Sequence, residues 1–124
     1  MKRAEDSIQA AVVAHLVARG VPGLVFWHTP NSSRLGGKRT KDGVPFEAIR
    51  LKALGLRSGV ADLIVVHNGR CFALELKSEK GRPTEPQMTF ISDFNAAGGN
   101  GCIVHGLDKA LKVLEVWGLL RGKS

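Results

Sequence analysis

The sequence has 124 residues, of which 44% are hydrophobic and 23% charged, and it carries a formal net charge of +7. This length predicts one domain, residues 1 to 124, with a single core. No apolar run is long enough to cross a bilayer, and charged residues interrupt the start that most resembles a signal peptide. We therefore expect an intracellular, cytoplasmic protein without a membrane partner, whose positive charge favours a nucleic acid.

An N-terminal helix is predicted up to about Arg19, with Asp6 or Ser7 as its cap and Gly20 after its end. Its apolar residues recur at helical spacing and form one stripe, consisting of Ile8, Ala11, Val12 and Leu16. Glu5 lies at the start of this helix. An acidic residue in a first turn commonly compensates the helix dipole, so its position has a purely structural explanation.

Leu24 to His28 is predicted as a short buried strand. From Thr29 to Pro45 the composition becomes polar and basic, and a segment this long without regular structure is usually functional or disordered. Its cations are opposed only by Asp42; they are Arg34, Lys38, Arg39 and Lys41. This loop either neutralises phosphates or is a solvated tether. His28 and Asn31 are candidate substrate contacts, with a core histidine and a turn asparagine as the plainer alternatives.

A short helix is predicted from Phe46 to Leu54, closed by Gly55, and Arg57 extends the basic path beyond it. An antiparallel hairpin follows, because two apolar runs flank Asn68-Gly69, the strongest short-range turn signal. The runs are Leu63 to Val66 and Cys71 to Leu76. With a type I′ turn at Asn68-Gly69, His67 faces Arg70. Counting back along both strands then places Asp62 opposite Glu75, about 5 Å apart at Cβ.

Lys77 shares a sheet face with Glu75, because side chains alternate along a strand, whereas Leu74 and Leu76 point into a core. Two facing carboxylates repel and need a compensating cation. Hard oxygen ligands suit Mg²⁺ or Mn²⁺, and a neighbouring lysine can position or deprotonate the attacking water. The alternative is that Asp62 caps a turn and the other two charges are solvated. The pairing favours a metal site.

The remaining chain predicts a helix, a strand and a second helix. The first helix opens at Thr84 with a capping-box pattern completed by Gln87, and Gly98-Gly99 ends it. Its expected buried residues are Met88, Ile91 and Phe94. The strand runs from Cys102 to His105 and the last helix from Asp108 to Trp117. The two cysteines, Cys71 and Cys102, lack zinc-site spacing and are interpreted as reduced core residues.

Several of these segments together carry a family resemblance: Gly59-Val60-Ala61-Asp62, Glu75-Leu76-Lys77, Gly81-Arg82 and Gln87, with Glu5 to Gln9 and His28 to Asn31 before them. They resemble the PD-(D/E)XK nuclease superfamily, and specifically its VRR-NUC branch of virus-type replication-repair nucleases. The resemblance covers nearly the whole chain. Ala61 stands where the family usually has a proline that is not a ligand, and the insert before Lys52 has no residue-by-residue counterpart.

The resemblance implies an α/β, restriction-endonuclease-like core of the order α-β-β-β-α-β, with a mixed sheet, a basic loop insertion and a C-terminal helix. It implies a Mg²⁺- or Mn²⁺-dependent endonuclease acting on branched or structured DNA, similar to Holliday-junction resolvases in repair or recombination. Standalone members are often homodimers, and phage-type members act in a bacterial host.

The resemblance also assigns roles to residues. Asp62, Glu75 and the backbone carbonyl of Leu76 would hold the metal, and Glu5 becomes a candidate fourth ligand. Lys77 would orient or activate water. Gln87 would lie near the active site, although the capping box alone also explains it.

Two rival functions belong to other classes. A non-catalytic nucleic-acid-binding module could keep this fold and use the basic loop without turnover. A nucleotide-binding domain is disfavoured, because the sequence has no GxGxxG or GxxxxGK[ST] stretch, and no nucleotide cofactor is expected. The choice between DNA and RNA stays open on charge alone.

Overall fold

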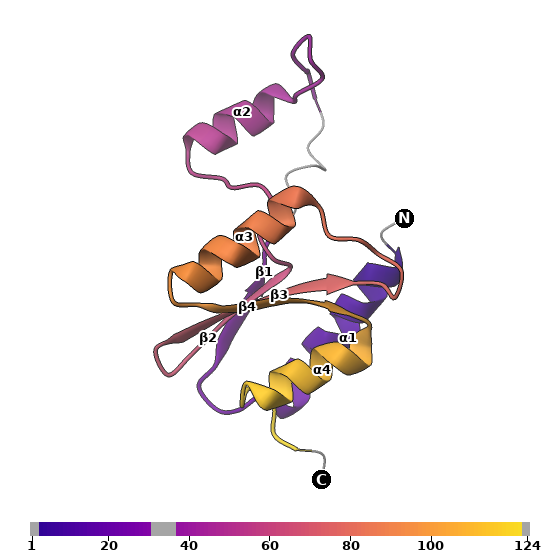
Figure 1. The fold of residues 1–124 in the computed structure, drawn as a ribbon, viewed down its shortest axis with the longest axis vertical. Coiled ribbons are helices and arrows are strands. Elements are labelled where there is room, and N and C mark those ends of the chain that lie inside the picture. Colours follow the sequence, from indigo (N-terminus) through magenta and orange to yellow (C-terminus); the bar gives the residue numbers. More distant parts are fainter. Residues whose placement is uncertain (1–2, 31–36, 123–124) are drawn as a thin grey trace.

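The computed structural model describes residues 3–30 and 37–122, within which the helices and strands follow the predicted order (Figure 1). They are α1 (Arg3–Arg19), β1 (Val25–His28), α2 (Phe46–Ala53), β2 (Leu63–His67), β3 (Arg70–Lys77), α3 (Glu85–Ala96), β4 (Asn100–His105) and α4 (Leu107–Val116). Helix α1 begins earlier than predicted, so Asp6 and Ser7 lie inside it and do not cap it. None of the described helices combines the length and apolar character needed to span a membrane.

The four described strands form one mixed sheet in the order β1-β2-β3-β4. Strands β1, β2 and β3 are antiparallel, and β4 runs parallel to β3. The predicted hairpin is confirmed together with its register, since His67 lies opposite Arg70 and Leu63 opposite Leu74. Asn68 and Gly69 have φ angles of 50° and 76°, as a type I′ turn requires. The predicted α/β class with a mixed sheet is therefore confirmed.

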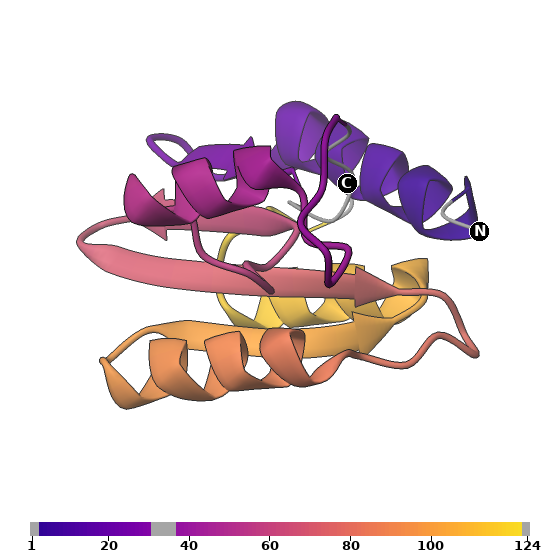
Figure 2. The same ribbon diagram turned by 90° about the horizontal axis from the view of Figure 1, so that it is seen from above.

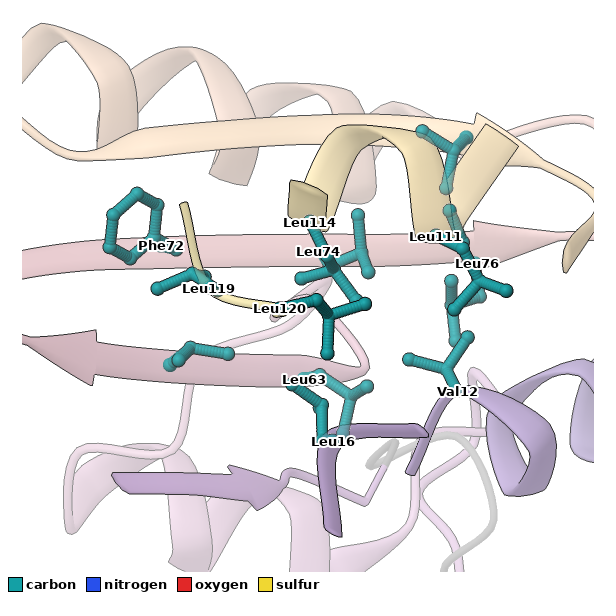
Figure 3. Packing of buried hydrophobic residues seen from close by; sticks show 13 residues of the cluster. Val12, Leu16, Leu63, Phe72, Leu74, Leu76, Leu111, Leu114, Leu119 and Leu120 are labelled. Atoms are coloured by element: carbon teal, nitrogen blue, oxygen red, sulfur yellow. The ribbon is translucent and has the colours of Figure 1, made fainter. Parts of the chain in front are cut away.

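The main core lies on the sheet face that α1 and α4 cover (Figures 1 and 2). Alternate residues of β2 and β3 point to this face, as the two-residue strand period requires. Figure 3 shows their packing against the helices and the segment after α4. The buried members are Val12, Leu16, Leu63, Val65, Phe72, Leu74, Leu76, Val104, Ala110, Leu111, Leu114, Leu119 and Leu120.

Helix α3 covers the opposite face of β3 and β4 (Figure 2). Its Phe90, Ile91 and Phe94 pack on a smaller cluster formed by Ala61, Ile64 and Ala73. The predicted buried side of α3 is wrong at Met88, which is 46% exposed. The inward stripe of the helix instead runs through Gln87, which is buried. Cys71 is exposed and not a core residue, because its side chain lies on this same face near the hairpin turn.

Helix α2 stands away from the sheet and the other helices (Figure 1). None of its residues is buried, and Phe46 and Ile49 are 54% and 47% exposed. Composition predicted a loop without regular structure before α2. The described part of this loop instead contains an isolated antiparallel bridge between Arg39 and Pro45. Between β1 and β2 the chain thus forms a small extension whose described residues, 37–55, belong to neither core cluster.

Candidate active site

Glu75 and Lys77 are not the solvated edge charges of the alternative interpretation. Glu75 and Lys77 are only 2% and 6% exposed, although both lie in the middle and end of β3 and carry charge. They point to the α3 side of the sheet because their neighbours Leu74 and Leu76 belong to the main core. Burying two charged groups is costly unless they are paired, so their burial singles out this position.

Asp62 is held by hydrogen bonds from two neighbouring segments. Its Oδ2 accepts a hydrogen bond from the backbone N–H of Leu76 at 2.8 Å. Its carbonyl oxygen accepts from the N–H of Thr29 at 3.2 Å and from the Nδ1 of His28 at 2.8 Å. The prediction that Asp62 pairs with Glu75 in the ladder is wrong, because the regular β2–β3 pairing ends at Leu63. The Asp62 carboxylate instead turns toward the backbone of β3.

Glu75 and Lys77 form a buried ion pair, with 3.6 Å between Oε2 and Nζ. The other oxygen of Glu75, Oε1, is buried and has no hydrogen-bond partner among the described residues. Burial and the negative charge of Asp62 raise the pKa of Glu75 to about 7, against the opposing effect of Lys77. Burial also raises the pKa of Asp62, although the N–H of Leu76 acts in the opposite direction.

A cleft of about 360 Å³ opens over these carboxylates. Its walls come from the N-terminal half of α1, the end of β1, the segment before β2, the middle of β3 and the first turn of α3. The lining residues are Glu5, Asp6, Gln9, Ala10, Val13, His28, Thr29, Pro30, Val60, Asp62, Glu75 and Gln87. The structure therefore brings the predicted site residues Glu5, Asp62, Glu75 and Gln87 to one cleft, together with His28.

Glu5 is compatible with both interpretations, as a residue that compensates the helix dipole and as a residue of the cleft. It lies in the first turn of α1, where a carboxylate compensates the helix dipole, and it also lines the cleft. A Cβ added at Gly81 would lie 2.9 Å from the Oε2 of Glu5. Because Gly81 has no side chain, it leaves room for the carboxylate of Glu5.

Gln87 forms the predicted capping box and also lines the cleft. Its Oε1 accepts from the N–H of Thr84 at 2.9 Å, and its own N–H donates to the Oγ1 of Thr84 at 3.3 Å, which completes the predicted capping box. The residue is 7% exposed and lines the cleft. Because the capping box uses only the carbonyl oxygen of its carboxamide, the amide nitrogen is left for the cleft.

The donor set suits a hard divalent cation. Carboxylate oxygens are the ligands that Mg²⁺ and Mn²⁺ prefer, and the buried Oε1 of Glu75 is an acceptor without a donor. Within residues 3–30 and 37–122, no three His, Cys, Asp or Glu side chains are already close enough together to hold an ion. The fit therefore rests on Asp62 and Glu75, with Glu5 across the cleft.

Of the described residues predicted to contact nucleic acid, His28 lines this cleft, whereas Lys38, Arg39, Lys41 and Arg57 do not. Asn31 and Arg34 lie outside the described residues. Lys38, Arg39 and Lys41 are exposed on the extension before α2, and Arg39 donates from Nη1 to the carbonyl of Gly43 at 2.8 Å.

Arg57 lies on another surface, where it has protein partners. Its guanidinium forms a 2.7 Å ion pair with Asp93 and lies 5.2 Å from the ring centre of Phe90. Both partners belong to α3. Arg57 therefore joins the segment before β2 to α3, in addition to any contact with a substrate.

Sequence reasoning missed residues that shape the cleft. Gln9 lies one helical turn after Glu5, so the i, i+4 spacing could have placed both on one side of α1. Gly59 has a φ of 78°, and a Cβ there would lie 2.3 Å from the carbonyl carbon and oxygen of Pro86. This contact joins the segment that carries Asp62 to the first turn of α3, and only the tertiary structure could reveal it.

The raised pKa of Glu75 predicts how stability depends on pH in metal-free protein. Between the ordinary value of 4.5 and about 7, folded Glu75 keeps a proton that the unfolded chain has released. The free energy of unfolding should therefore fall as the pH rises through this range, by on the order of 3 kcal/mol from this group. Urea unfolding in EDTA at several pH values measures the effect.

Glu75→Gln should remove this dependence, so that the difference between the wild-type and variant curves isolates the group. Glu85→Gln, at an exposed position in the first turn of α3, is the matched control. If the wild-type and Glu75→Gln curves run parallel, Glu75 does not titrate in this range.

Comparisons with known proteins bear on the fold. No family model and no curated protein matches the sequence. A solved structure described as a "VRR_NUC domain protein" superposes with a TM-score of 0.72 and 20% identity, over 92% of this chain and 87% of its own. Another, described as a "VRR_NUC domain", gives a TM-score of 0.58 and 19% identity, over 90% of this chain and 94% of its own. At the level of fold the predicted resemblance is confirmed, and the chain has the fold of these VRR-NUC domain structures.

Proposed function

We propose that this protein is a metal-dependent endonuclease that hydrolyses phosphodiester bonds in branched or otherwise structured DNA. The observation that supports this most is the buried Glu75–Lys77 ion pair, whose carboxylate lines the cleft together with Asp62. A fold keeps an ion pair with an unpartnered carboxylate oxygen at a cost in stability, and such arrangements concentrate at functional sites. The VRR-NUC fold makes phosphodiester hydrolysis the activity that best accounts for it.

The carboxylates of Asp62 and Glu75 and the backbone carbonyl of Leu76 would hold Mg²⁺ or Mn²⁺, and Glu5 would complete the set. When bound, the ion would polarise the phosphate and make water a better nucleophile at neutral pH. The hydrogen bond from the N–H of Leu76 to Asp62 fixes one carboxylate oxygen and so orients the other. The pKa values of both carboxyls are raised without metal, so ion binding would release protons.

Lys77 and Gln87 would act on the substrate and the attacking water. The ammonium of Lys77 is held beside Glu75 and shielded from solvent, so its charge would offset the negative charge that develops at the phosphate. It would also orient or activate the water. The amide nitrogen of Gln87 would donate a hydrogen bond to a phosphate oxygen.

The extension before α2 would bind the DNA backbone. Lys38, Arg39 and Lys41 are exposed there, and the chain carries a formal charge of +7. Cations that neutralise phosphates supply most of the sequence-independent affinity of a DNA-binding protein. A two-fold dimer would present two clefts for paired cuts in a branched junction, in keeping with a role in repair or recombination.

A cleavage assay tests the proposal directly. The wild type is incubated with labelled linear, single-stranded, flapped and four-way-junction DNA, in Mg²⁺, in Mn²⁺ and in EDTA. We expect cleavage only with metal, and a loss of at least about a hundredfold in Asp62→Asn and Glu75→Gln. Asp108→Asn, at an exposed position in the first turn of α4, is the control and should cut normally.

Two results would contradict the proposal. Cleavage at the wild-type rate in Glu75→Gln would place the chemistry elsewhere. Binding of DNA by the wild type without cleavage of any substrate would instead favour a non-catalytic nucleic-acid-binding module. Circular dichroism of each variant excludes loss of the fold as the cause.

A further inference from the structure

Trp27 is an exposed tryptophan on strand β1. It is 46% exposed, and its neighbour on the same side of the strand, Val25, is 59% exposed. Phe26 between them points the other way and packs against the main core. Helix α3 covers β3 and β4 on the Trp27 side of the sheet, and no helix of residues 3–30 and 37–122 makes comparable contacts with β1.

Trp27 directly precedes His28 and Thr29, which line the cleft together with Asp62, although Trp27 itself is not one of the lining residues. In the sheet Trp27 lies opposite Ile64, two residues after Asp62. The bonds from His28 and Thr29 to the carbonyl of Asp62 fix this end of β1 against the cleft.

The indole of Trp27 has no ring partner among the described residues, in contrast to Trp117, whose ring lies 5.1 Å from that of Phe72. A large aromatic side chain left in solvent beside a cleft for phosphate suits a nucleobase, because every base has a face that can stack. A base in a duplex is already stacked and paired. The nucleobase that is still able to stack on Trp27 is therefore an unpaired one.

We propose that Trp27 is a stacking platform for an unpaired DNA base adjoining the phosphate in the cleft. This inference rests on the proposed nuclease function and names its substrate class, which is DNA with a single-stranded segment beside the cut. Trp27 contributes affinity and selects the strand position, and Asp62, Glu75 and Lys77 carry out the chemistry. Flaps and frayed branch points then bind better than continuous duplex.

The test compares Trp27→Ala with Val25→Ala, a matched control on the same strand and face. Affinity is measured in EDTA, without cleavage, for a short labelled single-stranded oligonucleotide and for a blunt duplex. Trp27→Ala should weaken single-strand binding about tenfold or more and leave duplex binding unchanged. Trp27→Phe should give an intermediate loss, and Val25→Ala should bind as the wild type does.

Tryptophan fluorescence supplies a second measurement, which would not change on oligonucleotide binding if Trp27 had only a structural role. The chain has two tryptophans, so Trp117→Phe leaves Trp27 as the single emitter. Stacking predicts that the oligonucleotide quenches this emission and that the duplex does not. Unchanged emission with bound oligonucleotide would overturn the proposal.

Two other results would also overturn it. The first is equal binding of the single strand by Trp27→Ala and the wild type. The second is a change in solution mass in Trp27→Ala without a change in affinity, which would assign this face to a second copy of the chain. Loss of cleavage in all substrates with Trp27-dependent binding intact would reject only the nuclease function, so the two failures are distinguishable.

Discussion

Replacing Lys77 with methionine should destabilise the metal-free protein at about pH 8 by on the order of 3 kcal/mol, or roughly 10 °C in melting temperature for a domain of this size. Methionine keeps most of the apolar stem and removes the charge. Above the raised pKa of about 7, Glu75 is ionised, and its side chain is only 3% exposed. The variant therefore leaves a buried carboxylate without its cation.

Two conditions should reduce this loss. At about pH 5 Glu75 takes up a proton in the folded state, so the cost of Lys77→Met should shrink. Adding Glu75→Gln to Lys77→Met should restore much of the stability at high pH, because the amide carries no charge. Thermal melting of the four proteins of this double-mutant cycle in EDTA, at both pH values, measures both effects.

Lys109→Met, at an exposed position of α4, is the control and should change little. An equal loss at both pH values without rescue by Glu75→Gln would mean that Lys77 stabilises the fold through packing of its stem and not through its charge.

Replacing Gly59 with alanine should disturb both the fold and the cleft. The added Cβ would lie 2.3 Å from the carbonyl group of Pro86, which is backbone and cannot rotate away. Either α3 or the segment before Asp62 must then shift, and overpacking of this kind costs about 1–3 kcal/mol beyond any backbone strain. Because Gln87 follows Pro86 directly, we also expect cleavage to be lost.

Gly118→Ala separates strain from the close contact. Gly118 has the same φ of 78°, and a Cβ there would meet nothing within 4 Å. It should lose only the cost of the left-handed conformation, about 1–2 kcal/mol, and keep its activity. Urea unfolding and the cleavage assay on both variants test this, and equal stability losses would show that the Gly59–Pro86 contact is unimportant.

The local parts of this fold were predictable from sequence. Asn68-Gly69 sets the turn, and the turn length sets the register of the whole hairpin, because each residue of β2 then has one partner in β3. Alternation along β3 separates Glu75 and Lys77 from the core leucines in the same way. The capping box at Thr84 likewise depends on residues three positions apart.

Features that depend on distant segments were not predictable. Periodicity marked Met88 as buried, but the orientation of α3 is set by the sheet beneath it, and the helix turns Gln87 inward instead. The close approach of Gly59 to Pro86 likewise requires α3 to be docked. Asp62 does not pair with Glu75 in the ladder, because its carboxylate instead accepts a hydrogen bond from the backbone N–H of Leu76.

The hydrogen bond between the N–H of Thr29 and the carbonyl of Asp62 closes the excursion from β1 to β2 at its base. The two ends of the excursion are thus tied together whatever lies between them. Doubling the length of such a loop adds only about 0.6 kcal/mol of closure entropy, and α2 contributes no buried residue that would be missed. Changes in the length or sequence of this extension should therefore leave the position of the Asp62 carboxylate at its base unchanged.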